Sequence, residues 1–136
     1  MRISFTLIEL VMIIVIIAIL ASIAVPFYLR AAERSRNREA QAMLELLSDA
    51  QAMHRLEAQT FVACSDAPDC NSQLALNLPF GANRTWDYAV TTNAAGNTFT
   101  ATAARVNPPT GAGRTWSMNQ DDDEPSCSPS TSKYCE

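Results

Sequence analysis

Four cysteines and one histidine are the side chains with the greatest capacity for covalent or metal chemistry. They are Cys64, Cys70, Cys127 and Cys135, with His54 as the histidine. Neither cysteine pair has the Cys-x-x-Cys spacing of a zinc knuckle. An even number of cysteines in a short chain with an apolar N-terminal block is typical of disulfides. We therefore expect disulfides and an oxidising compartment outside the cytoplasm.

Four cysteines allow three pairings, and the sequence favours one of them. Cys64 and Cys70 bracket a short loop rich in Pro, Ser and Asp, and so do Cys127 and Cys135. On a loop-entropy argument, each of these bridges contributes about 2–3 kcal/mol to stability. Free thiols and a metal site are the alternatives that this argument leaves open.

The remaining polar residues do not form a recognisable catalytic pattern. The chain lacks a Gly-rich phosphate loop and has one histidine, so we expect no enzyme activity, no cofactor and no metal. The run Asp121–Glu124 offers oxygens to calcium, but a solvated charge run is the simpler interpretation. The net charge is −4 and the C-terminal half is acidic, so no nucleic-acid site is expected.

An apolar block follows the first few residues. Leu10–Val25 reads LVMIIVIIAILASIAV without a charge, and with Phe5–Ile8 the stretch reaches about 21 residues, enough to cross a bilayer as a helix. Three interpretations compete. The block is a signal peptide cleaved after Ala24, a plain membrane anchor, or a helix that first lies in the membrane and later packs against copies of itself.

Glu9 is the one charge that interrupts this stretch. An ionised carboxylate in hydrocarbon costs several kcal/mol, so such a residue normally has a partner and a function. Neither an anchor nor a signal peptide needs it, whereas a self-assembling helix can neutralise it with a cation of a neighbouring copy. The alternative is that Glu9 lies close enough to the membrane surface to stay solvated.

The segment Phe5-Thr-Leu-Ile-Glu-Leu10, after a short basic leader and before a long apolar run, resembles the processing motif of type IV pilins and type II secretion pseudopilins. Pro26 stands 21 residues after Phe5, where many members of that family carry a helix-kinking proline. The resemblance covers about the first 26 residues. Beyond them, only the general layout is similar.

The resemblance implies a maturation and assembly route. A prepilin peptidase would remove a leader of residues 1–4 by cutting between Ser4 and Phe5, and would methylate the Phe5 amine. Glu9 would pair with that amine on a neighbouring subunit during assembly. The family has glycine where this chain has Ser4. The expected partners are copies of the chain, the peptidase, the inner-membrane assembly machinery and, before assembly, the membrane.

A long helix is expected to continue from the apolar half, residues 5–27, into an amphipathic half, residues 28–59. Pro26 lacks an N–H, which predicts a kink or local melting around Ser22. Beyond it, one apolar stripe is predicted to pack under the sheet. Its members are Met43, Leu46, Leu47, Ala50 and Met53.

Three arginines form a basic row on the predicted helix. Arg30, Arg34 and Arg38 recur at a spacing of four, where like charges repel. They suit an anionic partner, either lipid headgroups before assembly or acidic residues of adjacent subunits after it, although a solvated face explains them too. Their position after the apolar block favours a cytoplasmic C-terminal part. We give more weight to the cysteines and the resemblance, which place that part outside.

Residues 60–136 are expected to form a globular β head. Thr60–Gly81 is predicted to be loop and Pro125–Glu136 a turn-rich tail. Three strands are predicted, joined first by a hairpin at Asn93–Asn97. They are Trp86–Val90, Thr98–Val106 and Arg114–Asn119. The predicted fold class is α+β, pilin-like, with a long N-terminal helix packed against an antiparallel sheet of three to four strands.

These features predict a structural subunit of a type IV pilus-like filament. The chain would cross the inner membrane once before assembly and then lie in an extracellular filament that serves adhesion, motility or DNA uptake. A type II secretion pseudopilin is the alternative. An exported monomeric binding module, released by cleavage after Ala24, is a further one.

Overall fold

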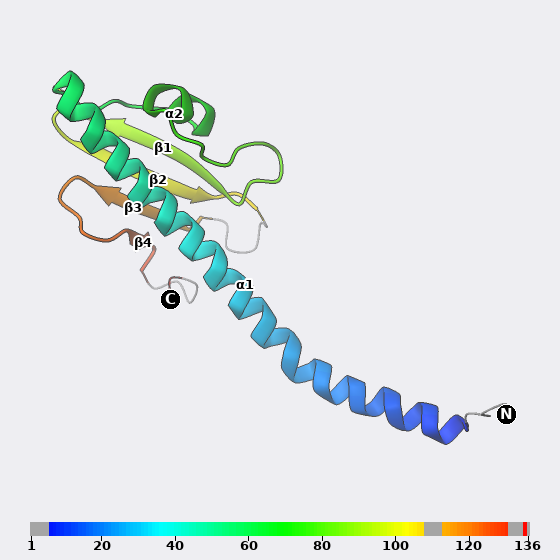
Figure 1. Ribbon diagram of the computed structural model, residues 1–136. Coiled ribbons are helices and arrows are strands. Elements are labelled where there is room, and N and C mark those ends of the chain that lie inside the picture. The colour runs from blue at the N-terminus through cyan, green and yellow to red at the C-terminus, as the bar shows by residue number, and fades with distance from the viewer. Residues whose placement is uncertain (1–5, 108–112, 131–134, 136) are drawn as a thin grey trace. The chain divides into compact units, whose positions relative to one another are not determined.

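The computed structural model describes residues 6–107, 113–130 and 135. They form an α+β fold in which a long helix packs against a small four-stranded antiparallel sheet, as the sequence predicts (Figure 1). The chain divides into two units, Met1–Ser35 and Arg36–Glu136. The elements in chain order are α1 (Leu7–Ala58), α2 (Ala67–Leu74), β1 (Trp86–Thr92), β2 (Phe99–Arg105), β3 (Thr115–Asn119) and β4 (Ser126–Ser128).

The first unit contains the apolar half of α1. The helix begins at Leu7, and Thr6 caps it: the Thr6 hydroxyl accepts a hydrogen bond from the backbone N–H of Glu9 at 3.3 Å. The helix is continuous through Pro26, so the predicted local melting is absent. One missing N–H removes a single hydrogen bond, and the turns on either side keep theirs. The Ser22 hydroxyl donates to the carbonyl of Ile19 at 2.7 Å.

The sheet has the simplest antiparallel order, β1-β2-β3-β4. The connection between β1 and β2 is the predicted hairpin. In it the Asn93 side-chain oxygen accepts hydrogen bonds from the backbone of Asn97 and Thr98, at 2.9 and 3.3 Å. Gly96 has a φ of +65°, and a Cβ there would lie 3.2 Å from the Thr60 side chain. Both the backbone conformation and the close approach of Thr60 therefore require glycine.

Small residues at the centre of the sheet leave room for large neighbours. Ala103 on β2 lies opposite Tyr88 of β1 on one side and Trp116 of β3 on the other, and all three are buried. The second half of α1 contributes Leu44 and Leu47 to the same core. The helix and the sheet thus bury a single apolar core, and its large aromatic side chains lie on either side of an alanine.

The buried face of α1 differs from the predicted stripe. Leu47 is fully buried and Met43 packs against the core, but Leu46 and Met53 are 41% and 68% exposed. Gln51 is buried instead. Its side chain accepts from the N–H of Val62 at 3.0 Å and donates to the Val62 carbonyl at 2.6 Å. An apolar periodicity misses this face because a hydrogen-bonded amide occupies one of its core positions.

The predicted loop Thr60–Gly81 contains a helix, α2. Asp66 caps it by accepting from the N–H of Asp69 at 2.9 Å, and a proline occupies its first turn. The same Pro and Asp that suggested a loop are thus the starting signal of a short helix. The tail predicted as a turn-rich loop likewise contains β4, which pairs with β3 and gives the sheet its fourth strand.

Candidate functional site

The apolar half of α1 is the main unpartnered surface of the part of the chain that the structure describes. Every large apolar side chain from Leu7 to Leu29 is exposed, by fractions of 42% at Ile13 to 81% at Leu7. By length and composition alone the helix is able to cross a membrane, and its most apolar window buries nothing against the rest of the chain.

Such a surface is unfavourable in water. Burial of one Leu, Ile or Val side chain is worth about 1.5–3 kcal/mol, and this segment exposes many of them. Among the described residues, the chain itself provides no cover for these side chains. The expected membrane-length helix is therefore present, and its large apolar side chains are exposed.

Glu9 lies in the first turn of α1, exposed on the same segment. Thr6 and Glu9 also have the Ser/Thr-x-x-Glu spacing of a capping box, a local signal that the prediction of this helix did not use. A carboxylate in the first turn also interacts favourably with the helix dipole. Ser4 and Phe5, the expected cleavage and methylation residues, lie outside the described residues, so the pairing of Glu9 with a Phe5 amine stays a prediction.

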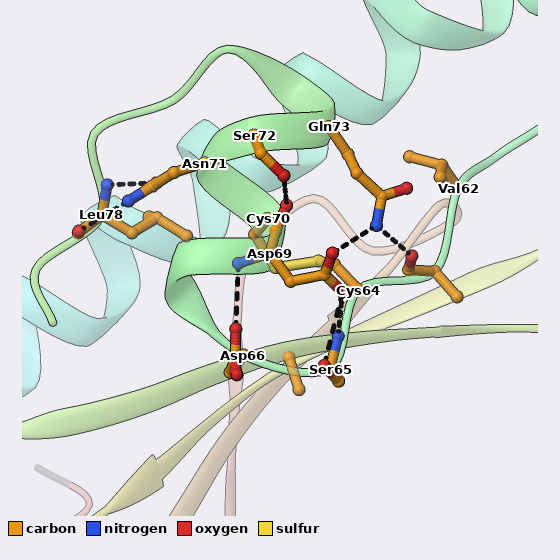
Figure 2. The surroundings of a disulfide bond; sticks show 12 residues. Val62, Cys64, Ser65, Asp66, Asp69, Cys70, Asn71, Ser72, Gln73 and Leu78 are labelled. Carbon is orange, nitrogen blue, oxygen red and sulfur yellow. Dashed lines mark hydrogen bonds between the residues drawn. A yellow bond between two sulfur atoms is a disulfide. The ribbon is translucent and has the colours of Figure 1, made fainter.

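The cysteines form the pairs that the sequence favoured. Cys64 is bonded to Cys70, with a Cα–Cα distance of 5.1 Å, and Cys127 to Cys135, with 5.8 Å. Cys64 also pairs through its backbone with Val90 of β1, at 3.0 and 2.8 Å. The first disulfide therefore fastens α2 to the edge of the sheet, as Figure 2 shows.

Asp69 organises the loop inside this first disulfide (Figure 2). Its carboxylate accepts from the backbone N–H of Ser65 at 2.8 Å and from the Gln73 amide at 2.7 Å. These bonds, the backbone bond first, lower the pKa of Asp69 below its ordinary value of 3.8. Asn71 makes a similar connection, accepting from the N–H of Leu78 at 2.6 Å and donating to its carbonyl at 3.0 Å.

The acidic run Asp121–Glu124 has a local structural role. Asp122 accepts from the backbone N–H of Asn119 at 2.9 Å, and Asp121 accepts from the Gln120 amide at 2.7 Å. These bonds close the turn after β3. Within residues 6–107, 113–130 and 135, no three His, Cys, Asp or Glu side chains are grouped so as to hold a metal ion.

The head also buries polar side-chain atoms that have no hydrogen-bond partner among the described residues. The Tyr88 hydroxyl has no hydrogen-bond partner among the described residues, and neither has the Trp116 indole N–H. Burial, and secondarily the charge of Glu39, raises the pKa of Tyr88. The Trp86 indole, by contrast, donates to the carbonyl of Arg36 at 2.9 Å.

Comparison with known proteins gives no further guide. No protein-family model, no curated protein and no solved structure matches the chain. The exposed apolar helix and the two disulfides are therefore the observations on which a functional proposal rests.

Proposed function

We propose that the chain is the structural subunit of a type IV pilin-like filament, in which the apolar half of α1 packs between copies. The observation that carries the proposal is that every large apolar side chain between Leu7 and Leu29 is exposed. Before assembly, lipid covers them. After assembly, neighbouring copies of the same segment cover them.

Self-association is favoured over a plain anchor by two features of the segment. Glu9 would need a partner if it entered hydrocarbon, and the amine of a neighbouring chain is a suitable one. Ala18 and Ser22 are four residues apart on α1 and both exposed. Small residues at that spacing allow helices to approach closely within a membrane, where packing rather than water drives association.

The disulfide-bearing head would lie outside the cytoplasm, on the surface of the filament. Disulfides persist in oxidising compartments, and the structure contains two of them. The bridge Cys127–Cys135 resembles the disulfide-closed loop of type IV pilins, which favours a pilus subunit over a pseudopilin. The chain does no chemistry on a substrate in this proposal, and its function is to bind copies of itself.

The Glu9→Ala variant tests the role of the carboxylate. We expect it to enter the membrane normally but to yield at least about tenfold fewer filaments, because one buried charge pair per subunit is lost. Filaments are counted by electron microscopy after shearing, and insertion is measured by membrane fractionation. Both are done in a strain that supplies a pilus assembly machinery.

Thr6→Ala is the matched control, because it removes the helix cap but keeps the carboxylate. Near-normal filament yield in Thr6→Ala, beside the loss in Glu9→Ala, would assign assembly to the charge. Equal losses in the two variants would assign Glu9 to capping. Normal filaments in Glu9→Ala would contradict the proposed pairing. A mature chain that starts at Val25 would support the exported binding module instead.

A further inference from the structure

Two exposed faces of α1 have the same spacing and opposite charge. The first, here called the basic face, consists of Phe27, Arg30, Ala31 and Arg34 and belongs to the first unit. The second, here called the acidic face, consists of Ala42, Glu45, Leu46 and Asp49 and belongs to the second unit. Both sets follow i, i+3, i+4 and i+7, so each forms one side of a helix.

The acidic face points away from the protein core. Leu44 and Leu47 are fully buried under the sheet, whereas every member of the acidic face is exposed and Leu46 is 41% exposed. Met53 and Leu56 extend this surface with 68% and 80% exposure. Leu46, Met53 and Leu56 thus follow one another along one side of the helix. A side that faces solvent seldom carries three such apolar side chains unless a partner covers them.

The charged side chains of the two faces are available to a partner. Arg30, Arg34, Glu45 and Asp49 are all exposed. Among the described residues, none of the four has an ion pair within 4.0 Å. The basic face therefore presents two cations beside an aromatic ring, and the acidic face presents two anions beside a leucine.

We propose that the basic face of one copy docks on the acidic face of a second copy, with the two helices parallel and shifted by about four helical turns. This inference rests on the proposed filament function, which inserts all copies in one orientation and so excludes antiparallel pairing. At this shift each residue meets a complementary one. The pairs are Phe27 with Ala42, Arg30 with Glu45, Ala31 with Leu46, and Arg34 with Asp49.

The complementarity is steric as well as electrostatic. Phe27 meets an alanine, and Leu46 meets an alanine, so a large side chain lies opposite a small one at both apolar positions. Exposed ion pairs contribute little affinity but discriminate strongly between registers. In an unshifted parallel pair, Arg30 would lie against Arg30 and Glu45 against Glu45. The charges therefore select the shifted register, and the apolar contacts stabilise it.

Cysteine cross-linking in assembled filaments tests the register directly, because two copies that both span a bilayer lie at the same depth and are not shifted by four turns. Two tagged full-length copies are co-produced, one with Ala31→Cys and the other with Leu46→Cys, and disulfide-linked heterodimers are measured after mild oxidation. We expect strong cross-linking of this pair and at least about fivefold less for two copies of Ala31→Cys, or for Ala31→Cys with Leu56→Cys. Equal yields in the three pairings would overturn the shifted register.

Charge reversal separates a protein partner from a lipid partner. Arg30→Glu with Arg34→Glu in one copy should lower the Ala31–Leu46 cross-link at least about fivefold. Glu45→Arg with Asp49→Arg in the other copy should restore it. A loss that the second reversal does not restore, together with weaker insertion of the Arg30→Glu, Arg34→Glu copy into vesicles rich in phosphatidylglycerol, would assign the arginines to lipid headgroups and overturn the proposal.

One further measurement separates this inference from the function on which it rests. Filament yield, counted by electron microscopy, reports association through the apolar half of α1 in any register. Filaments without the Ala31–Leu46 cross-link would overturn the docking of the two faces and leave the proposed filament subunit intact. Absence of the filaments themselves would overturn the proposed function together with the inference.

Discussion

Leu20 and Leu44 belong to the same helix but to different environments. Leu20, in the apolar half of α1, is 62% exposed, whereas Leu44 is fully buried against the sheet. The second unit thus gains stability by burying its own apolar side chains, whereas the described residues of the first unit leave their large apolar side chains exposed. The head buries its own apolar core, whereas the proposed function assigns the cover of the apolar half of α1 to lipid or to other copies.

The largest expected effect distinguishes these two leucines. Leu44→Ala should destabilise the head by about 2–5 kcal/mol, because it leaves a cavity in the core. Leu20→Ala should change the free energy of unfolding of the head by less than about 0.5 kcal/mol. Denaturant titration of the full chain in detergent, followed by the fluorescence of Trp86 and Trp116, measures both. Similar losses in the two variants would show that the head depends on the apolar half of α1.

Removal of the first disulfide should have the next largest effect. Cys64 and Cys70 are both buried, and replacing them with alanine should cost about 2–3 kcal/mol by freeing the unfolded chain. The second bridge joins Cys127, which is only partly buried, so its removal should expose less of the core. Thermal unfolding of the two double variants compares them. A greater loss from removing Cys127 and Cys135 would contradict this order.

Gln51→Ala should cost about 1–3 kcal/mol, because the backbone N–H and carbonyl of Val62 lose their hydrogen-bond partner in a buried place. Met53→Ala is the control two residues away, and its effect should stay within about 0.5 kcal/mol since Met53 is exposed. Denaturation midpoints measured by circular dichroism give both values. A larger loss of stability in Met53→Ala than in Gln51→Ala would contradict this assignment and support the predicted packing of Met53 under the sheet.

Asp69→Asn should have the smallest effect, and that effect should depend on pH. Folding lowers the pKa of Asp69 below its ordinary value of 3.8. The ionised carboxylate therefore stabilises the fold at every pH above that value, and this contribution is lost as the pH falls through the lowered pKa. We expect the variant to melt no more than a few degrees lower at neutral pH. The difference should disappear in strong acid. A difference that is constant from neutral pH to strong acid would exclude a role for the charge.

The sequence predicted the strands, the hairpin and both disulfides because their signals are local. Alternation around Trp86 and Tyr88, the glycine of the hairpin, and short Cys spacings each depend on neighbours in the chain. It missed α2 because Pro and Asp begin helices as well as loops. It missed the buried face of α1 because Gln51 finds its partner at Val62, and periodicity does not reveal a tertiary hydrogen bond.

The candidate site was predictable to a similar degree. An apolar stretch of about 21 residues, long enough to cross a bilayer as a helix, requires no tertiary information, and it reappears as an exposed helix. The role of Glu9, in contrast, is not decided by its neighbours in the sequence. The same carboxylate serves a capping box within one chain or an ion pair between chains, and the sequence of a single subunit does not distinguish the two. The partner of Glu9 is therefore a question for assembly experiments.

Electron microscopy of sheared surface filaments, with mass spectrometry of their subunit, tests the central claim most directly. The account predicts filaments built from this chain, with a mature subunit that begins at Phe5 and retains the apolar half of α1. A soluble, single-copy protein beginning at Val25 would contradict it.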